Sequence, residues 1–548
     1  MNTALIRHPK HILFGIICLA TLLRVGLLGK IPVGLYIDEV AIGVDAVSVS
    51  QTGRDMHGNS ALQAIYPSYG DYKLPVYILL SAVSVKMFGT NEFAVRFPSA
   101  VAGVGTVVAV YILAKDFFQR SKQKERIALC AAAFIAIMPW SILFSRSGFE
   151  GHVGQFFLLL SAVAAFRSHK SIWWCIITAL FGAMAVYTYY SVRFVFPVVL
   201  VGVMSIQMTS LQWKALVGKF LLSIMLWMVL LIPMVRSPLY EASQRFRLSA
   251  RSVLQDYDKQ VGRANELRSE DQFSLASRVF HHRYLYLVKD LARNYAANMS
   301  LPFLFLTGDP NLRHGTGKVG LMLFPTLPIF LIGMYVIARR YKKEGFVLLM
   351  WYMVSLLPAS VPYEIPHALR SLNALGVFGL VLGIGADACI HWCLSKKRMG
   401  YVLLVAGFCI IIVSLGMFMA DYLLSYPSRS AMVWFDGNKQ AASFLASKRG
   451  EGVSLAASGD EKMFLWYAFY AGISGKELQT IQSISYRKPY IGSVKFGTNA
   501  LNDALRANEN GYALGTSMEL YDDVSESIYG ASGIPVYGVK RISPKGAK

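Results

Sequence analysis

Charged residues are scarce in this sequence. They make up 16% of the 548 residues, whereas a soluble domain carries about 25%. Hydrophobic residues reach 55% and gather in blocks long enough to cross a bilayer, for which about 20 residues are needed. This composition excludes an ordinary soluble globular protein and indicates a polytopic α-helical membrane protein.

Acidic residues are also few, with 32 against 54 lysines and arginines and a formal net charge of +22. In a soluble protein this excess would suggest a nucleic-acid partner. Here the basic residues collect in short loops beside apolar segments, which is typical of cytoplasmic loops. The sequence has no basic helix with interleaved aromatic residues, so we expect a lipid bilayer and no nucleic acid as a partner.

Cysteine is rare as well, and a nucleotide-binding signature is missing. All six cysteines lie within or beside apolar segments, which excludes a disulfide scaffold and a cysteine-rich metal site. The sequence contains no Gly-rich nucleotide fingerprint, tandem repeat or low-complexity run. A donor activated by a bound nucleotide is therefore not expected.

The apolar blocks predict about eleven membrane spans. Their expected ranges are 11–30, 96–114, 127–145, 149–166, 171–189, 192–209, 217–235, 319–338, 346–361, 368–392 and 400–424. The short basic loops fall on every second connection, so they predict a cytoplasmic N-terminus. The loops 31–73 and 236–318 then lie outside the cytoplasm, and the apolar segment 74–88 becomes a re-entrant or interfacial helix.

The chain changes character after the last span. Residues 1–424 form the predicted membrane module, and residues 425–548 are polar. Alternating patterns at 452–458 and 535–542 predict strands, and helices are expected at 438–448 and 460–471. We therefore predict a small extracytoplasmic α/β domain at the C-terminus of a multi-pass protein of the cell inner (plasma) membrane.

Acidic candidates for chemistry stand at the outer ends of the first spans. Asp38 and Glu39 follow the first span, and Glu150 and His152 lie in the second outer loop. Adjacent carboxylates at a membrane interface are costly to desolvate unless they serve a site, although a solvated turn is an equally simple explanation. Tyr189, after the fifth span, is a further site candidate, although tyrosines at this depth more often belong to an interfacial aromatic belt.

A second set of candidates consists of cations that would neutralise a donor phosphate through charge-assisted hydrogen bonds. Each could instead be a snorkelling or structural residue, but all fall on the same face of the predicted topology. They are Lys73, Arg146, Arg193, Arg313, His314, His367 and Arg370.

Carboxylates and cations on one outer face suit glycosyl transfer from a lipid-linked sugar. The lipid tail would stay in the bilayer, and cations would stabilise the phosphate as it leaves. A carboxylate would take the proton from the attacking hydroxyl group. The expected partners are a polyprenyl-phosphate sugar donor and a glycan, lipid or protein acceptor.

Several short motifs occur in an order that resembles GT-C glycosyltransferases of the family 39 type, which include protein O-mannosyltransferases and aminoarabinose transferases. They are the pair at 38–39, the Lys-Leu-Pro turn at 73–75, FAVRFPS at 93–99, YTYY at 187–190 and PHALRSL at 366–372. The resemblance implies a GT-C fold, Asp38 as the catalytic base, a polyprenyl-phosphate sugar donor and inversion at the anomeric carbon. The chain departs from the family pattern where Leu74 and Glu150 replace the usual Pro and Asp.

Two other functions fit parts of the pattern. A transporter of lipid-linked glycans would require charged residues near the bilayer midplane and paired repeats, which the sequence does not show. A glycan polymerase or ligase would use outer arginines without needing the early acidic pair. The sugar, the acceptor and the metal requirement stay open, because Asp38, Glu39 and Glu150 could hold a divalent ion or act without one.

Overall fold

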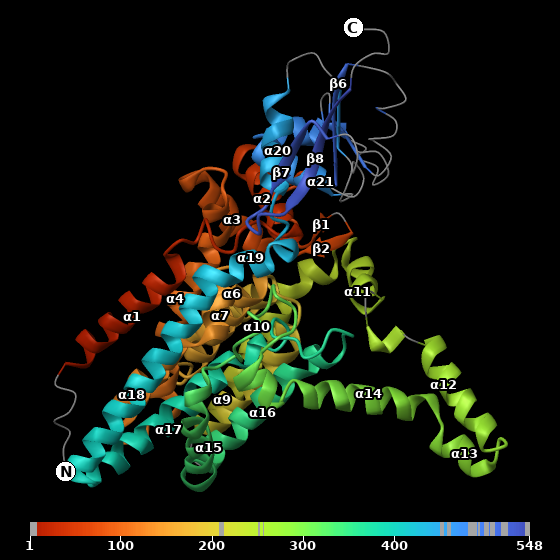
Figure 1. The fold of residues 1–548 in the computed structure, drawn as a ribbon. Helices are drawn as coiled ribbons and strands as arrows, with labels where there is room; N and C mark the ends of the chain where they lie inside the picture. The colour runs from red at the N-terminus through yellow and green to blue at the C-terminus, as the bar shows by residue number, and fades with distance from the viewer. Residues whose placement is uncertain are drawn as a thin grey trace. The chain divides into compact units, whose positions relative to one another are not determined.

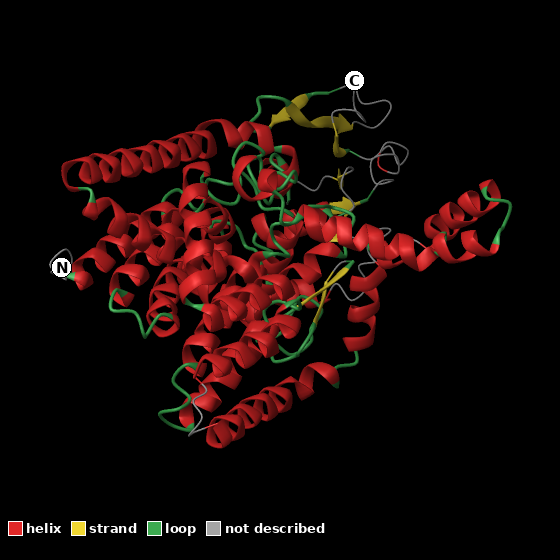
Figure 2. Ribbon diagram, turned by 90° about the horizontal axis from the view of Figure 1, so that it is seen from below, coloured by secondary structure: helices red, strands yellow, loops and turns green. Residues whose placement is uncertain are grey.

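The computed structural model is mostly helical, with few strands (Figure 2). It describes residues 8–68, 70–207, 213–249, 252–255, 257–449, 454–457, 462–480, 490–491, 494–497, 504, 510–516 and 524–542. The chain divides into two compact units. Unit 1 comprises residues 1–24, 101–145 and 150–418, and unit 2 comprises residues 25–100, 146–149 and 419–548.

Unit 1 contains the long apolar helices (Figure 1). Its helices are α1 (Pro9–Val25), most of α4 (Glu92–Phe117), α5 (Lys124–Ile137), α6 (Pro139–Ser145), α7 (Glu150–Ala165), α8 (Trp173–Val186), α9 (Val192–Gln207), α10 (Trp213–Val235), α11 (Tyr240–Ser249), α12 (Tyr257–Glu270), α13 (Leu275–Phe280), α14 (Arg283–Ala297), α15 (Leu327–Arg340), α16 (Lys342–Ser360), α17 (Leu375–Ser395) and α18 (Lys397–Ala420). Short helical turns at η2 (Val253–Gln255), η3 (Pro302–Leu306), η4 (Phe324–Thr326) and η5 (Leu372–Ala374) complete it.

Each predicted span contains a helix. Among the described residues, four helices are long and apolar enough to cross a membrane, and a fifth candidate is the bent pair α5 and α6. Other predicted spans correspond to shorter apolar helices, such as α8 and α9. The structure therefore has the apolar helices of a multi-pass membrane protein, while the count of eleven spans stays a prediction.

The bend of 57° between α5 and α6 has an identifiable cause. Pro139 begins α6 and has no backbone N–H, so carbonyls at the end of α5 lose their helical donors. The buried Arg24 replaces them, because its guanidinium donates to the carbonyls of Ile135 (2.9 Å) and Ala136 (3.0 Å). It also donates to the Ser141 hydroxyl at 2.8 Å, so one side chain bridges the break.

Unit 2 has a core of mixed helices and strands. It contains α2 (Ile37–Thr52), α3 (Pro75–Phe88), α19 (Tyr426–Ser430), α20 (Asn438–Ser447), α21 (Met463–Tyr470), α22 (Gly475–Thr480), and the turns η6 (Asp421–Ser425) and η7 (Met432–Trp434). Its strands are β1 (Tyr66–Ser68), β2 (Asp71–Lys73), β3 (Ser454–Ala457), β4 (Tyr490–Ile491), β5 (Val494–Phe496), β6 (Gly511–Thr516), β7 (Glu526–Tyr529) and β8 (Pro535–Ile542).

The sheet in this unit has the strand order β4-β5-β3-β6-β8-β7. Strand β3 pairs in parallel with β5 and β6, and the outer pairs are antiparallel. Apolar residues of α2 and α21 share one buried core with this sheet, and the Trp466 indole donates to the Leu35 carbonyl at 3.0 Å. The first loop therefore folds as part of the same body as the tail.

The predicted elements of the tail agree with the structure where its residues are described. Helices α20 and α21 lie within the ranges 438–448 and 460–471, and β8 occupies 535–542. Strand β3 lies in the predicted strand 452–458, whose residues 452, 453 and 458 are outside the described residues. A separate domain beginning at residue 425 stays a prediction, because unit 2 also includes residues 25–100.

Candidate active site

The carboxylate pair begins α2, where the positive end of the helix favours negative charge. The two side chains have opposite environments. Glu39 is fully buried, whereas the side chain of Asp38 is 36% exposed. The sequence placed both in the catalytic role, but the structure leaves only Asp38 accessible to a substrate.

Glu39 is surrounded by donors from unit 2. Its Oε1 accepts from Arg96 Nε (2.9 Å) and from the Gly148 N–H (2.6 Å). Its Oε2 accepts from Arg96 Nη2 (3.0 Å) and the Tyr36 N–H (3.2 Å). These bonds tie the start of α2 to two other segments, so the geometry favours a positioning role for Glu39.

Arg96 is a residue that the sequence reasoning missed. It is fully buried, and besides Glu39 it donates to the carbonyls of Pro32 (2.8 Å) and Leu28 (3.3 Å). The signal was available, because an arginine inside an apolar helix is expensive unless it is paired. Arg96 stood at the start of a predicted span within the FAVRFPS motif.

Lys73 holds the accessible carboxylate. It ends β2, and the β1–β2 hairpin carries it to Asp38 and Asp71. The Lys73 Nζ donates to Asp38 Oδ1 and, at 2.9 Å, to Asp71 Oδ2, while only 3% of its side chain is exposed. Two of the three N–H donors of the Lys73 ammonium group are therefore directed at carboxylates, which favours a role for Lys73 in holding Asp38.

Arg146 was predicted to bind phosphate, but its contacts in unit 2 are structural. Its guanidinium donates to the carbonyls of Gly26 (2.7 Å) and Ile31 (3.2 Å). It also lies over the Tyr422 ring, 5.3 Å from the centroid, and the residue is 1% exposed. These contacts favour a role in holding the loop that contains residues 26–31.

Unit 1 brings together four of the predicted cations. The loop after η3 supplies Arg313 and His314, and the segment before η5 supplies His367 and Arg370. The imidazole rings of His314 and His367 stack, with centroids 4.8 Å apart. Both histidines are buried and both arginines are partly exposed, so the cluster offers cationic groups to an anion.

Three other predicted residues of unit 1 lie on α7 and α9. Arg193 lies over the Phe194 ring at 4.8 Å, two residues after Ser191, which accepts a hydrogen bond from Asn373 at 2.9 Å. Glu150 begins α7 and is partly exposed, whereas His152 is fully buried within that helix.

Tyr189 packs on the same helix. A Cβ atom added at Gly151 would lie 3.6 Å from the Tyr189 ring and 2.8 Å from Leu369. At Gly154 it would lie 2.9 Å from the Tyr189 Cβ. The two glycines therefore allow α7 to approach the tyrosine and the PHALR segment closely.

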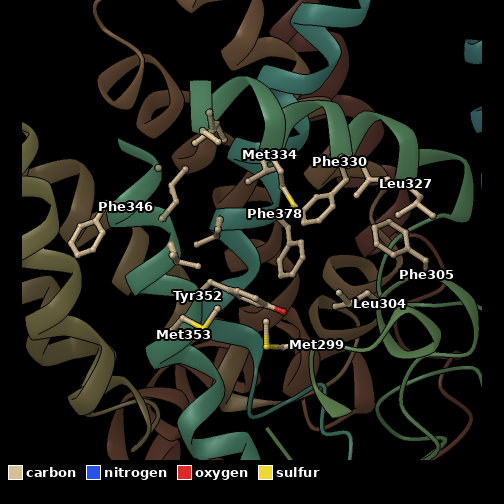
Figure 3. Close-up of a pocket in the computed structure, with 18 of the residues that line it drawn as sticks. Met299, Leu304, Phe305, Leu327, Phe330, Met334, Phe346, Tyr352, Met353 and Phe378 are labelled. Carbon is tan, nitrogen blue, oxygen red and sulfur yellow. The ribbon is translucent and has the colours of Figure 1, made fainter. Parts of the chain in front are cut away.

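An apolar groove of about 660 Å³ lies within unit 1 between α15, α16 and α17. The side chains of Phe330, Tyr352 and Phe378 converge on this space (Figure 3). One end is lined by Met299, which follows Asn298, whose Oδ1 accepts from the His367 N–H at 2.8 Å. One lining residue of the groove is therefore the chain neighbour of a side chain that binds the His367 backbone.

The chain shows similarity to known proteins at several levels. Residues 72–235 match the family model described as dolichyl-phosphate-mannose-protein mannosyltransferase. The putative mannosyltransferase YkcB of Bacillus subtilis (strain 168) is 34% identical over 104 residues. That match spans 18% of this chain and 14% of the relative.

Solved structures match over much more of the chain. ArnT from Cupriavidus metallidurans in the apo state has a TM-score of 0.56 at 10% identity and covers 98% of both chains. The same protein bound to undecaprenyl phosphate has a TM-score of 0.55. The Archaeoglobus fulgidus oligosaccharyltransferase has a TM-score of 0.53 at 11% identity, over 94% of this chain and 70% of the other. At this identity, the likeness establishes a shared fold.

Proposed function

We propose that this chain, which has the fold of the GT-C glycosyltransferases, is a membrane glycosyltransferase that takes its sugar from a polyprenyl-phosphate donor. The observation that carries the proposal is the accessible Asp38 at the start of α2, held by the buried Lys73. The match of residues 72–235 to a mannosyltransferase family and the undecaprenyl phosphate bound by ArnT support the class of donor.

Asp38 acts as the general base. Its carboxylate takes the proton of the acceptor hydroxyl group while that oxygen attacks the anomeric carbon of the donor sugar. The bond from this carbon to the phosphate oxygen breaks, and the polyprenyl phosphate leaves with the bonding electrons. Attack opposite the leaving group inverts the configuration at the anomeric carbon.

In unit 1, one set of residues suits the phosphate of the sugar donor and another suits its polyprenyl chain. Arg313 and Arg370 are partly exposed cations suited to the phosphate, whose negative charge grows as it leaves. The groove lined by Phe330 and Phe378 takes the polyprenyl chain (Figure 3). It suits a hydrocarbon because its lining is almost entirely apolar.

The finer topology belongs to the same proposal. The chain crosses the plasma membrane about eleven times with its N-terminus in the cytoplasm, and the α/β domain at 425–548 lies outside. Basic loops such as 115–126 and 339–344 support this orientation. Single cysteines introduced at residues 122 and 440 test it, because an impermeant thiol reagent should label only the second in intact cells.

The acceptor is a hydroxyl group on a glycan, lipid or protein. Transport of lipid-linked glycans, or their polymerisation or ligation, is the alternative function. Neither accounts for the accessible Asp38 beside a buried lysine, and the family match over residues 72–235 favours sugar transfer. Sugar transfer by the purified protein in detergent, where no membrane separates two compartments, would also distinguish a glycosyltransferase from a transporter.

The deciding experiment incubates the purified full-length protein with a panel of polyprenyl-phosphate sugars and acceptors, followed by mass spectrometry. Asp38→Asn should lower the transfer rate by about 10²- to 10⁴-fold, the contribution typical of general acid–base catalysis. The matched control is Asp71→Asn, because Asp71 is the other carboxylate on Lys73 and is 27% exposed. Full activity in Asp38→Asn, or an equal loss in both variants, contradicts the assignment of the base.

A further inference from the structure

Asp309, His314 and His367 bring three ligand-type side chains into one buried cluster of unit 1. One ligand atom from each lies within 4.8 Å of the others, and no other such group of His, Cys, Asp and Glu occurs in the part of the chain that the structure describes. Asp309 is 2% exposed, and each histidine is 7% exposed. The sequence predicted the two histidines as phosphate contacts and did not select the aspartate.

Backbone hydrogen bonds fix the cluster before any ligand arrives. Asp309 Oδ1 accepts from the Asn311 N–H and Oδ2 from the Ala368 N–H, both at 2.8 Å. The carboxylate therefore joins the two segments that carry the histidines. The N–H of His367 itself donates to Asn298 Oδ1 at 2.8 Å, which anchors the second segment to the end of α14.

The spacing is close to that of a coordination sphere. Asp309 Oδ2 and His314 Nδ1 are 3.3 Å apart. Bonds of about 2.0–2.1 Å in a tetrahedral zinc site place neighbouring ligand atoms roughly 3.3 Å apart. The planes of the His314 and His367 rings are 27° apart, so the second ring would have to turn to direct a nitrogen at the same ion.

His367 has a ring nitrogen that could bind a metal ion. Its Nδ1 is buried and has no hydrogen-bond partner among the described residues. Buried polar atoms in native proteins are ordinarily paired, and a bound metal ion would supply the missing partner.

We propose that Asp309, His314 and His367 form a binding site for a divalent transition metal ion of the zinc type. Two imidazoles with one carboxylate suit zinc better than magnesium or calcium, which prefer oxygen ligands. Three protein ligands leave a fourth position for water or an anionic oxygen. The positive charges of Arg313 and Arg370 oppose a cation, so the affinity should be lower than in closed four-ligand sites.

The test measures metal binding and does not depend on glycosyl transfer. Full-length protein in detergent is stripped with a chelator, and Zn²⁺ is titrated against a fluorescent chelator. One equivalent should bind to the wild type. His314→Ala and His367→Ala should each weaken binding at least about tenfold, because each removes a ligand and the loss of even a ligand's hydrogen-bond partner typically costs about 10- to 100-fold in affinity.

A matched control comes from another histidine–aspartate pair of unit 1. His281 Nε2 lies 2.8 Å from Asp271 Oδ2, on a more exposed part of the unit, and His281→Ala should leave zinc binding unchanged. Visible d–d absorption of Co²⁺ added in place of Zn²⁺ reports coordination by the wild type alone, so a variant that fails to fold does not decide the outcome. A wild type that binds no Zn²⁺, or binding that persists in the His314→Ala/His367→Ala double variant, overturns the proposal.

Discussion

At the scale of single residues, Asp38 and Glu39 differ because one side of α2 faces the buried Arg96 and the other faces Lys73. Glu39 accepts four hydrogen bonds in the interior, and Asp38 keeps part of its surface in contact with solvent. An acidic base needs access to the hydroxyl proton, so burial separates the positioning residue from the candidate base.

Glu39→Gln should destabilise the protein strongly. The substitution leaves the buried Arg96 charge without its partner, which costs about 3–5 kcal/mol. Thermal unfolding of the purified protein measures the change. The control Glu92→Gln breaks a pair with the half-exposed Lys439 and should lower the unfolding temperature much less. Equal unfolding temperatures for Glu39→Gln and the wild type would contradict this role.

Asp45→Asn should raise stability at neutral pH. Burial raises the pKa of the Asp45 carboxyl group well above its usual value, and its Oδ2 has no hydrogen-bond partner among the described residues. The unfolded chain loses this proton at a lower pH than the folded chain, so stability falls as pH rises from about 4 toward the raised pKa. In the wild type, the Met56 N–H donates to Asp45 Oδ1 at 3.0 Å, and the side-chain oxygen of asparagine can accept the same hydrogen bond.

The measurement is the unfolding temperature of wild type and Asp45→Asn between pH 4 and pH 8. The difference should grow in favour of the variant as pH rises. A variant that is less stable than the wild type at pH 8 would show that Asp45 is ionised in the folded protein and held by partners such as Lys73.

At the scale of elements, the α5–α6 break depends on one arginine. Arg24→Met keeps most of the side-chain volume but leaves the carbonyls of Ile135 and Ala136 without their donors. Unsatisfied buried acceptors cost about 1–3 kcal/mol each, so the unfolding temperature and the yield of monodisperse protein should both fall. The control is Thr21→Val on the same helix, which removes only an exposed bond to the Ile17 carbonyl. An unfolding temperature of Arg24→Met equal to that of the wild type would mean that water donates to the two carbonyls in place of Arg24.

At the scale of the whole molecule, the groove needs residues from four separate segments. Met299 precedes η3, Phe330 belongs to α15, Leu349 to α16 and Phe378 to α17. Part of its lining is exposed, with Leu331 at 55% and Leu349 at 47%, so a lipid chain could enter from the side. The polyprenyl chain of the proposed donor would therefore contact residues from several segments, which no single sequence motif contains.

Leu349→Trp should fill part of the groove and raise the KM for long polyprenyl donors. Donors with one or two isoprene units should be affected less, because their short tails do not require the filled part. Steady-state kinetics with both donor lengths measures the difference. Val229→Trp on α10, 52% exposed and outside the groove, is the control. An equal effect of Leu349→Trp on short and long donors would contradict the assignment of the groove.

The amino-acid sequence by itself determined the class of the protein. Apolar blocks separated by basic loops predicted the helices, because the bilayer permits few other structures, and short motifs in order predicted the GT-C fold that the structural similarities confirm. Strand and helix patterns in the tail also predicted α20, α21 and β8, since local periodicity fixes these elements. The roles of the candidate site residues stay predictions.

Only the tertiary structure decided which polar residue is accessible and which is enclosed. Arg146 and Glu39 look like site residues in sequence, yet protein carbonyls and N–H groups surround them. Asp309 was passed over, although it joins two distant loops beside His314 and His367. Burial and partners depend on segments far apart in the chain, as Arg146 and Gly26 are, so no local pattern carries that information.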